Sequence, residues 1–307
     1  MNDPSANGDA IVSQACGSGP AWVNVLGVRV SAVNLQSATA RIDTAIAEGR
    51  REYVCVRDAH GVIRCQADAE LRSAHNRAFM VTPDGMPLLW ALKRAGHAKS
   101  SRVYGPDLML AALQAGRSKG RRHFLYGATA DTLERLRARL VEKFPDLRIA
   151  GSWAPPFRDL SAREEEEIAD RINRSRADIV WVGIGSPKQE LWMAHMRARL
   201  DAPILVGVGA AFDFHAGLKR QAPRILQRSG FEWAFRLCCE PRRLWRRYAV
   251  VVPSFLVLTL LQRLGLRQFP IEQSPPPAGP VADPGNRPRA FGRVFAVPAE
   301  PSSSKSR

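Results

Sequence analysis

The sequence predicts an α/β fold with a doubly wound, mainly parallel sheet. Short apolar runs of strand length alternate with amphipathic helical segments through residues 21–217. The runs are almost wholly apolar, as in 177–182 ADIVWV, which is typical of strands buried on both faces. Hydrophobic residues make up 45% of the 307 positions, enough for one large core or two modest ones.

In the first half of the chain, valine-rich 22–33 predicts a strand, and 37–49 predicts a helix that ends at a glycine. Apolar 53–58 and 78–85 predict strands, the second leading into a turn and a helix over 86–96. In the second half, strands are predicted at 121–128, 147–153, 177–185 and 202–212. Apolar residues at helical spacing predict helices at 129–144, 161–175 and 189–200.

The regions outside this core have different compositions. We expect 1–20 to be a disordered N-terminus and 269–307 a disordered tail rich in proline, glycine and serine. Residues 218–268 form a basic and apolar C-terminal segment, whose apolar run 249–261 is shorter than the roughly 20 residues a membrane span needs. Because Pro253 also interrupts that run, we predict no transmembrane helix.

Charge and cysteine content limit the classes of function. A net charge of +16 predicts an acidic partner: nucleic acid, anionic lipid or a phosphorylated substrate. The five cysteines show no metal-ligand spacing, and the N-terminus lacks an apolar signal core. We therefore expect free thiols in a cytoplasmic, reducing compartment.

Candidate functional residues lie where predicted strands end, the edge at which doubly wound sheets bind ligands. Asp84 follows one strand and suits a general base, although an Asx turn or a helix cap explains it too. Gly127 and Thr129 follow another, where a free helix N-terminus favours phosphate, or where an ordinary turn lies. Within the segment 202–212, Gly207 and Gly209 would let a ligand approach the backbone.

The segment GIGSPKQE, 183–190, admits two interpretations. Ser186 at the N-cap and Gln189 at the third helical position fit a capping box. In the second interpretation the cap is combined with binding, and Lys188 and Gln189 face a phosphate or a sugar hydroxyl. The dinucleotide and P-loop glycine fingerprints are both missing from the sequence, so neither of those sites is expected.

The block 218–248 combines arginines with aromatic residues immediately before the apolar run. Arginine forks suit phosphate, and the aromatics suit a nucleobase stack or a membrane interface. The neighbouring apolar run favours an interfacial contact with an anionic membrane surface. An ordinary solvated basic helix beside a core helix is the alternative.

Five motifs, taken together and in order, resemble the WecG/TagA/CpsF glycosyltransferases, glycosyltransferase family 26. These motifs are TPDGMPLLW, RVYGPDL, ADIVWVGIGSPKQELW, VGVGAAFDFHAG and RQAPRILQRSGFEWAFRLCCEPRRLWRRY, within roughly 23–248. The resemblance implies a Rossmann-like core with a membrane-associating helical appendage. It implies an inverting transfer, without a metal or other cofactor, from a nucleotide diphosphate-sugar, usually UDP-linked, to a polyprenyl diphosphate-linked acceptor at the cytoplasmic membrane face. Exopolysaccharides are among the products of the family.

The resemblance also assigns roles to individual residues. It implies that Asp84 is the catalytic base, that Arg102 and Gln189 contribute to the active site, and that appendage arginines reach the donor diphosphate. The candidate substrate-binding residues are Asp58, His60, Gly127, Gly185, Ser186, Lys188, Asp213, Arg236, Arg243 and Arg246. Val56 stands where many members carry a threonine, so Asp58 and His60 become candidates for the contact that valine cannot make.

The expected function is therefore a hexosyltransferase of cell-surface polysaccharide synthesis, peripheral on the inner face of the bacterial plasma membrane. Two alternatives are a non-catalytic membrane-associated module that binds nucleotide-sugars and a basic nucleic-acid-binding protein. No recognised nucleic-acid motif occurs in the sequence, so we expect no nucleic acid partner. An oligomer is compatible with the sequence, which shows no legible interface pattern.

Overall fold

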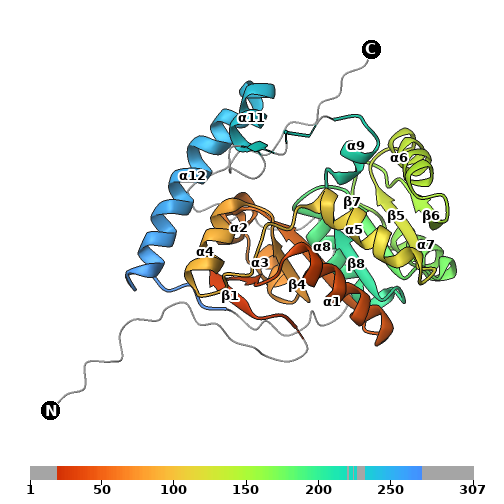
Figure 1. Cartoon of the computed structure of the whole chain (residues 1–307), viewed down its shortest axis with the longest axis horizontal. Helices are drawn as coiled ribbons and strands as arrows, with labels where there is room; N and C mark the ends of the chain where they lie inside the picture. Colours follow the sequence, from red (N-terminus) through yellow and green to blue (C-terminus); the bar gives the residue numbers. More distant parts are fainter. Residues whose placement is uncertain (1–18, 220, 224, 227–231, 272–307) are drawn as a thin grey trace.

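The fold is built on a six-stranded parallel sheet with helices on both faces, seen in a computed structural model that describes residues 19–219, 221–223, 225–226 and 232–271 (Figure 1). The strand order is β4-β3-β8-β7-β5-β6. The strands are β3 (Glu52–Arg57), β4 (Met80–Pro83), β5 (Arg122–Gly127), β6 (Arg148–Trp153), β7 (Ile179–Gly183) and β8 (Ile204–Gly207). The predicted doubly wound α/β fold is confirmed.

Helices cover the sheet in two layers. On one face lie α1 (Leu35–Ala47), α5 (Gly105–Arg117), α6 (Ala130–Lys143) and α9 (Ala211–His215). On the other lie α2 (Ala59–Ala67), α3 (Ala69–Asn76), α4 (Met86–Arg94), α7 (Ala162–Ser175) and α8 (Lys188–Met196), which continues as a 3₁₀ turn, η1 (Arg197–Arg199). Sequence analysis missed α2, α3, α5 and α9. Three of these helices, α2, α3 and α9, have nine residues or fewer, and α9 begins inside the segment interpreted as a strand at 202–212.

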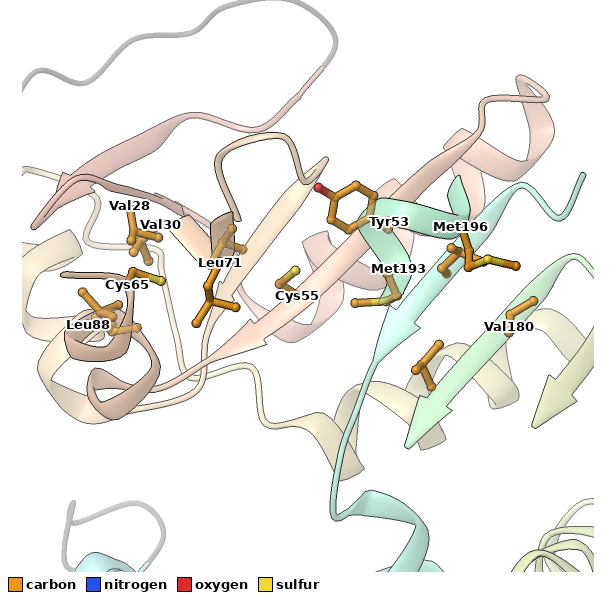
Figure 2. Packing of buried hydrophobic residues seen from close by; sticks show 14 of the residues in the cluster. Val28, Val30, Tyr53, Cys55, Cys65, Leu71, Leu88, Val180, Met193 and Met196 are labelled. Atoms are coloured by element: carbon orange, nitrogen blue, oxygen red, sulfur yellow. The ribbon is translucent and has the colours of Figure 1, made fainter. Parts of the chain in front are cut away.

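Each face of the sheet carries its own apolar core. Figure 2 shows part of one core, in which Cys55 of β3 appears between Leu71 of α3 and Met193 of α8, and which also includes Val180 of β7. The central strands β7 and β8 are buried almost completely, with Trp181 and Leu205 fully inaccessible. Burial on both faces explains why the strands are almost wholly apolar in sequence.

The first predicted strand, 22–33, is instead an antiparallel hairpin outside the main sheet. Its strands are β1 (Trp22–Val25) and β2 (Val28–Ser31). The turn residues Leu26 and Gly27 have φ values of 50° and 80°. Two positive φ angles in a two-residue loop are typical of a turn that folds a strand back on itself, so continuous apolar sequence here does not mean one strand.

The C-terminal segment contains α11 (Glu232–Cys239) and α12 (Pro241–Arg263). The basic residues and the apolar run, treated separately above, belong to one helix, since α12 continues through Pro253. Proline removes one helical hydrogen bond, and Pro253 and Ala249 are exposed, so water can bind the freed carbonyl. In Figure 1, α12 runs along the side of the core beside α2.

The end of α12 is anchored in the core. Gln262 is buried, and its Oε1 accepts a hydrogen bond from the backbone N–H of Leu26 at 3.0 Å while its Nε2 donates to the Asn24 carbonyl at 3.1 Å. Asn24 donates in turn to the carbonyl of Phe269 at 2.8 Å. Phe269, placed by sequence at the start of a disordered tail, is buried here against the hairpin core. Residues 1–18 and 272–307 lie outside the described residues.

Among the helices that the structure describes, none combines the length and the apolar character required to span a bilayer. For α12 the reason is visible in its sequence, because PRRLWRR occupies its first two turns.

Candidate active site

The candidate residues gather at the carboxyl edge of the sheet, as expected from the strand order. Asp84 follows β4, Asp58 follows β3, and the segment carrying Gln189 follows β7. These strands are neighbours or are separated only by β8. Parallel strands end at a common edge, so segments far apart in the chain meet there.

Asp84 and Arg102 form an ion pair at this edge. Arg102 donates to Oδ1 of Asp84 from Nε at 3.0 Å and from Nη2 at 2.9 Å, and its guanidinium lies over the ring of Tyr104 at 4.5 Å. The two side chains are 23% and 18% exposed, so the carboxylate is within reach of a ligand. An arginine contact favours the charged carboxylate, the form that accepts a proton.

The capping box predicted for the segment after β7 is wrong. Helix α8 begins at Lys188 behind Pro187, and no side chain caps it. The Ser186 hydroxyl instead accepts a hydrogen bond from Nη1 of Arg57 at 2.8 Å. The Ser186 hydroxyl thus binds an arginine from the end of β3 and not a backbone N–H of its own helix. The spacing of residues within 183–190 could not reveal this contact.

Gln189 belongs to a buried polar cluster with Arg57 and Glu190. Arg57 forms an ion pair with Oε1 of Glu190, and Nε2 of Gln189 donates to the same oxygen at 2.8 Å. The three side chains are at most 4% exposed. Burial is the largest single influence on Arg57 and disfavours its charge, but the Glu190 carboxylate and weaker neighbouring groups such as Asp58 together outweigh burial and raise the pKa of the guanidinium above its ordinary value.

Sequence analysis missed Arg57 and Glu190. The available signal was charge inside apolar sequence: Arg57 ends the run YVCV, and Glu190 precedes Leu191 and Trp192 in an otherwise apolar helix face. A charged side chain that is buried is usually paired with an opposite charge, but the sequence does not show which two residues form the pair.

Of the candidates on β3 and α2, Asp58 is the N-cap of α2, accepting from the Gly61 N–H at 2.8 Å. Asp58 also lies against Gly85: a Cβ added to Gly85 would stand 3.5 Å from the Cβ of Asp58. Asp58 therefore borders the turn that carries Asp84. His60 lies half-buried in the first turn of α2. Val56 packs partly buried against the apolar core, and its register partner on β4 is Thr82.

Gly127 is explained by strand packing. Its φ is +135°, and a Cβ there would lie 2.5 Å from the carbonyl carbon of Gly183 on β7. Thr129 caps α6, accepting from the Thr132 N–H at 3.2 Å, so the ordinary-turn interpretation is sufficient here. Gly185, with φ +85°, lies in the turn between β7 and α8, and nothing would meet a Cβ there within 4 Å.

The remaining candidates are more exposed. Lys188 is 65% exposed and lies 4.0 Å from Asp159. Asp213 pairs with Lys219 at 2.7 Å in the first turn of α9, and His215 beside it contacts the Pro106 carbonyl at 3.0 Å. Arg236 lies in α11 and Arg243 and Arg246 in α12, but their side chains lie outside the described residues.

Metal-ligating groups are not gathered anywhere in the described ranges, where no three His, Cys, Asp or Glu side chains could together hold an ion. The described cysteines Cys55, Cys65 and Cys238 are free thiols. At the strand edge, arginines pair with the carboxylates: Arg102 with Asp84 and Arg57 with Glu190.

Comparison with known proteins identifies the family of the chain. The model of the glycosyl transferase WecG/TagA/CpsF family matches residues 23–269. The chain belongs to this family. The match includes both the sheet and α12, and it makes the protein a glycosyltransferase.

Two curated relatives carry the same name, N-acetylglucosaminyldiphosphoundecaprenol N-acetyl-β-D-mannosaminyltransferase. The one from Bacillus spizizenii is 32% identical over 183 residues, which cover 60% of this chain and 68% of the relative. The one from Bacillus subtilis is 27% identical over 189 residues, which cover 62% and 71%. Both names describe the transfer of a sugar to a lipid-linked acceptor.

Proposed function

We propose that this protein is an inverting glycosyltransferase that moves a sugar from a nucleotide diphosphate-sugar, UDP-linked in the simplest case, to a polyprenyl diphosphate-linked glycan. The observation that carries the proposal is the family match, together with relatives named for a diphosphoundecaprenol-linked acceptor. The ion-paired aspartate at the strand edge supports it, because acceptor activation needs a proton acceptor.

In the proposed reaction the Asp84 carboxylate takes the proton of an acceptor sugar hydroxyl. The hydroxyl oxygen forms a bond to the anomeric carbon of the donor, and the bond from that carbon to the diphosphate oxygen breaks. Attack from the face opposite the leaving group inverts the anomeric centre. Arg102 holds the base in place through its bonds to Oδ1.

Negative charge grows on the departing nucleoside diphosphate and requires stabilisation. We assign this role to Arg236, Arg243 and Arg246 of the C-terminal helices, since guanidinium groups bind phosphate oxygens in pairs. In this proposal the reaction needs no metal ion or other cofactor.

We further propose that α12 contacts an anionic membrane surface at the inner face of the plasma membrane, where it would meet its lipid-linked acceptor. An exposed apolar stripe supports this: Trp245, Val252, Leu256, Leu260 and Leu264 recur at helical spacing and are between 45% and 61% exposed. Exposed Arg242 and Arg263 lie at the ends of the helix, where they can bind lipid phosphates. The pathway we propose is cell-surface or exopolysaccharide synthesis.

The second candidate is a non-catalytic membrane-bound module that binds nucleotide-sugars. Val56 favours it, since a partly buried valine offers no hydrogen bond to a substrate. A basic nucleic-acid-binding protein would explain the net charge alone.

A donor screen tests the proposal. The full chain is mixed with lipid vesicles, short-chain polyprenyl diphosphate-GlcNAc and each common UDP-, GDP- or TDP-sugar, and release of nucleoside diphosphate is followed. We expect release from one donor that depends on the acceptor and continues in excess chelator. Binding of a donor without transfer from any would support the non-catalytic module. Salt-sensitive DNA binding without donor binding would support the third candidate.

A further inference from the structure

The ion pair between Arg57 and Glu190 is the most deeply buried charge pair among the described residues. Its side chains are 4% and 0% exposed, and it lies at the carboxyl edge of the sheet. A buried ion pair contributes little net stability compared with an apolar pair of the same size, because both charges lose their hydration. Stability alone is therefore a weak reason for its presence.

Arg57 connects both turns that carry candidate active-site residues. Its carbonyl accepts a hydrogen bond from the backbone N–H of Asp84 at 2.8 Å. Its Nη1 donates to the Ser186 hydroxyl at 2.8 Å, and its Nη2 pairs with Glu190 in the first turn of α8. One residue at the end of β3 thus fixes the turn after β4 relative to the turn after β7.

Glu190 sets the orientation of the Gln189 side chain. An ionised carboxylate only accepts hydrogen bonds, so the amide of Gln189 must turn Nε2 toward it. The amide oxygen then lies on the side of Gly209, where a Cβ would stand 3.5 Å from it. Among the described residues it has no hydrogen-bond partner, and neither has Oε2 of Glu190 or Nε of Arg57.

Unsatisfied buried polar atoms cost free energy and call for an explanation in native structures. Two of these atoms belong to the ion pair itself, and the third belongs to Gln189, which donates a hydrogen bond to Glu190. The cluster of Arg57, Glu190 and Gln189 lowers stability and also joins the turns after β4 and β7. Such a cluster is expected if it sets the geometry of the active site between those turns.

We propose that Arg57 and Glu190 are positioning residues that hold the Asp84 turn and the Gln189 amide in one fixed arrangement. Neither acts on the substrate directly. The proposal rests on the function proposed above, because it takes Asp84 and Gln189 as parts of the sugar-transfer site.

Gly61 shows how closely Arg57 is held. A Cβ at position 61 would lie 2.2 Å from Cδ and 2.4 Å from Nη1 of Arg57. Gly61→Ala would therefore displace the guanidinium without altering any charge in the cluster. This substitution therefore tests the effect of moving the Arg57 side chain while its charge and that of Glu190 are kept.

The test uses the full chain and the double variant Arg57→Met/Glu190→Met, which leaves no buried charge unpaired. Hydrogen exchange measured by mass spectrometry reports on residues 82–86 and 183–190, and thermal unfolding reports on stability. We expect a melting temperature near that of the wild type but exchange in both turns faster by about tenfold. Turnover should fall by about 100-fold with donor affinity little changed, since small misplacements have such effects.

Gly61→Ala supplies an independent variant and should show the same pattern of exchange if the double variant does not fold. The matched control is Arg197→Met, since Arg197 is a half-buried arginine at the opposite edge of the sheet that donates only to backbone carbonyls. This control should lower the melting temperature and leave exchange in both turns unchanged.

Wild-type exchange in both turns, in whichever of the two variants folds, would overturn the proposal. Because exchange is measured without substrate, a wild type that transfers no sugar would remove the proposed function while the exchange comparison still decides whether Arg57 and Glu190 position the turns.

Discussion

At the scale of single residues, the site depends on charges whose partners come from other elements of the fold. Asp84 meets Arg102, eighteen positions away, and Arg57 meets Glu190 across the sheet edge. Each pair puts a group where its neighbours limit its behaviour: Arg102 fixes one carboxylate oxygen, and Glu190 fixes an amide.

Asp84→Asn tests the proposed base. An amide of the same shape keeps the turn but cannot take a proton, so we expect turnover to fall by about 10²- to 10⁴-fold with donor affinity near that of the wild type. Steady-state kinetics and calorimetric titration with the donor measure the two quantities. Asp131→Asn, in an exposed ion pair with Arg135, is the control. Near-normal turnover in Asp84→Asn would remove it as the base.

His75 makes stability depend on pH. Burial and then the nearby Arg57 charge lower its pKa from 6.5 to about 3. The unfolded chain therefore binds a proton that the folded chain does not, so the contribution is complete above about pH 6.5 and declines by roughly 1.4 kcal/mol per unit as the pH falls toward 3.

Urea unfolding at about pH 7 and pH 5 measures this effect. We expect His75→Gln, whose amide can still donate to the Leu71 carbonyl, to lose about 2 kcal/mol less stability over that interval than the wild type. Equal losses in the two proteins would show that His75 does not titrate in this way.

At the scale of elements, α12 has two unlike faces. Val251 and Phe255 are buried in the core, whereas Leu256 and Leu260 are 61% and 54% exposed. Gln262 joins the end of the helix to the first hairpin. The helix thus belongs to the fold on one side and offers an apolar surface on the other.

Gln262→Ala tests the anchored side. The N–H of Leu26, a fully buried residue, loses its acceptor, so we expect the free energy of unfolding to fall by about 1–3 kcal/mol. Chemical denaturation measures the loss. Gln114→Ala, which removes an exposed contact with Arg117, should change stability by less than about 0.5 kcal/mol. Equal small effects would mean that the anchor is dispensable.

Leu256→Gln/Leu260→Gln tests the exposed side. Each leucine would lose roughly 1.5 kcal/mol of burial in lipid, so binding to anionic vesicles should weaken by about tenfold or more with folding unaffected. Co-sedimentation with vesicles measures binding. Val141→Gln, at an exposed apolar position of α6, is the control and should bind as the wild type does. Unchanged binding of the double variant would exclude this stripe as the lipid contact.

At the scale of the whole molecule, the net charge of +16 favours negatively charged surfaces. We expect vesicle binding to require anionic lipid and to weaken steeply as salt rises from about 0.05 to 0.5 M, since the Debye length is about 10 Å at 0.1 M. Titration of vesicles at several salt concentrations checks this. Salt-independent binding to neutral vesicles would assign the affinity to the apolar stripe alone.

The sequence alone determined the layered fold, because β-α alternation and strands apolar on both faces leave few other arrangements. It also placed Asp84 and Gln189 at strand ends, since a parallel sheet puts those ends at one edge. A local pattern sufficed at Thr129, which lies in an ordinary turn and caps α6.

Only the tertiary structure decided which distant groups meet. Ser186 looked like a helix cap, but its hydroxyl accepts a hydrogen bond from Arg57 at the end of β3. Phe269 looked like the start of a disordered tail, but the hairpin core buries its ring and Asn24 donates a hydrogen bond to its carbonyl. In each case the deciding partner lies more than a hundred residues away, and only folding creates a hydrogen bond over that separation, so local sequence carries no record of it.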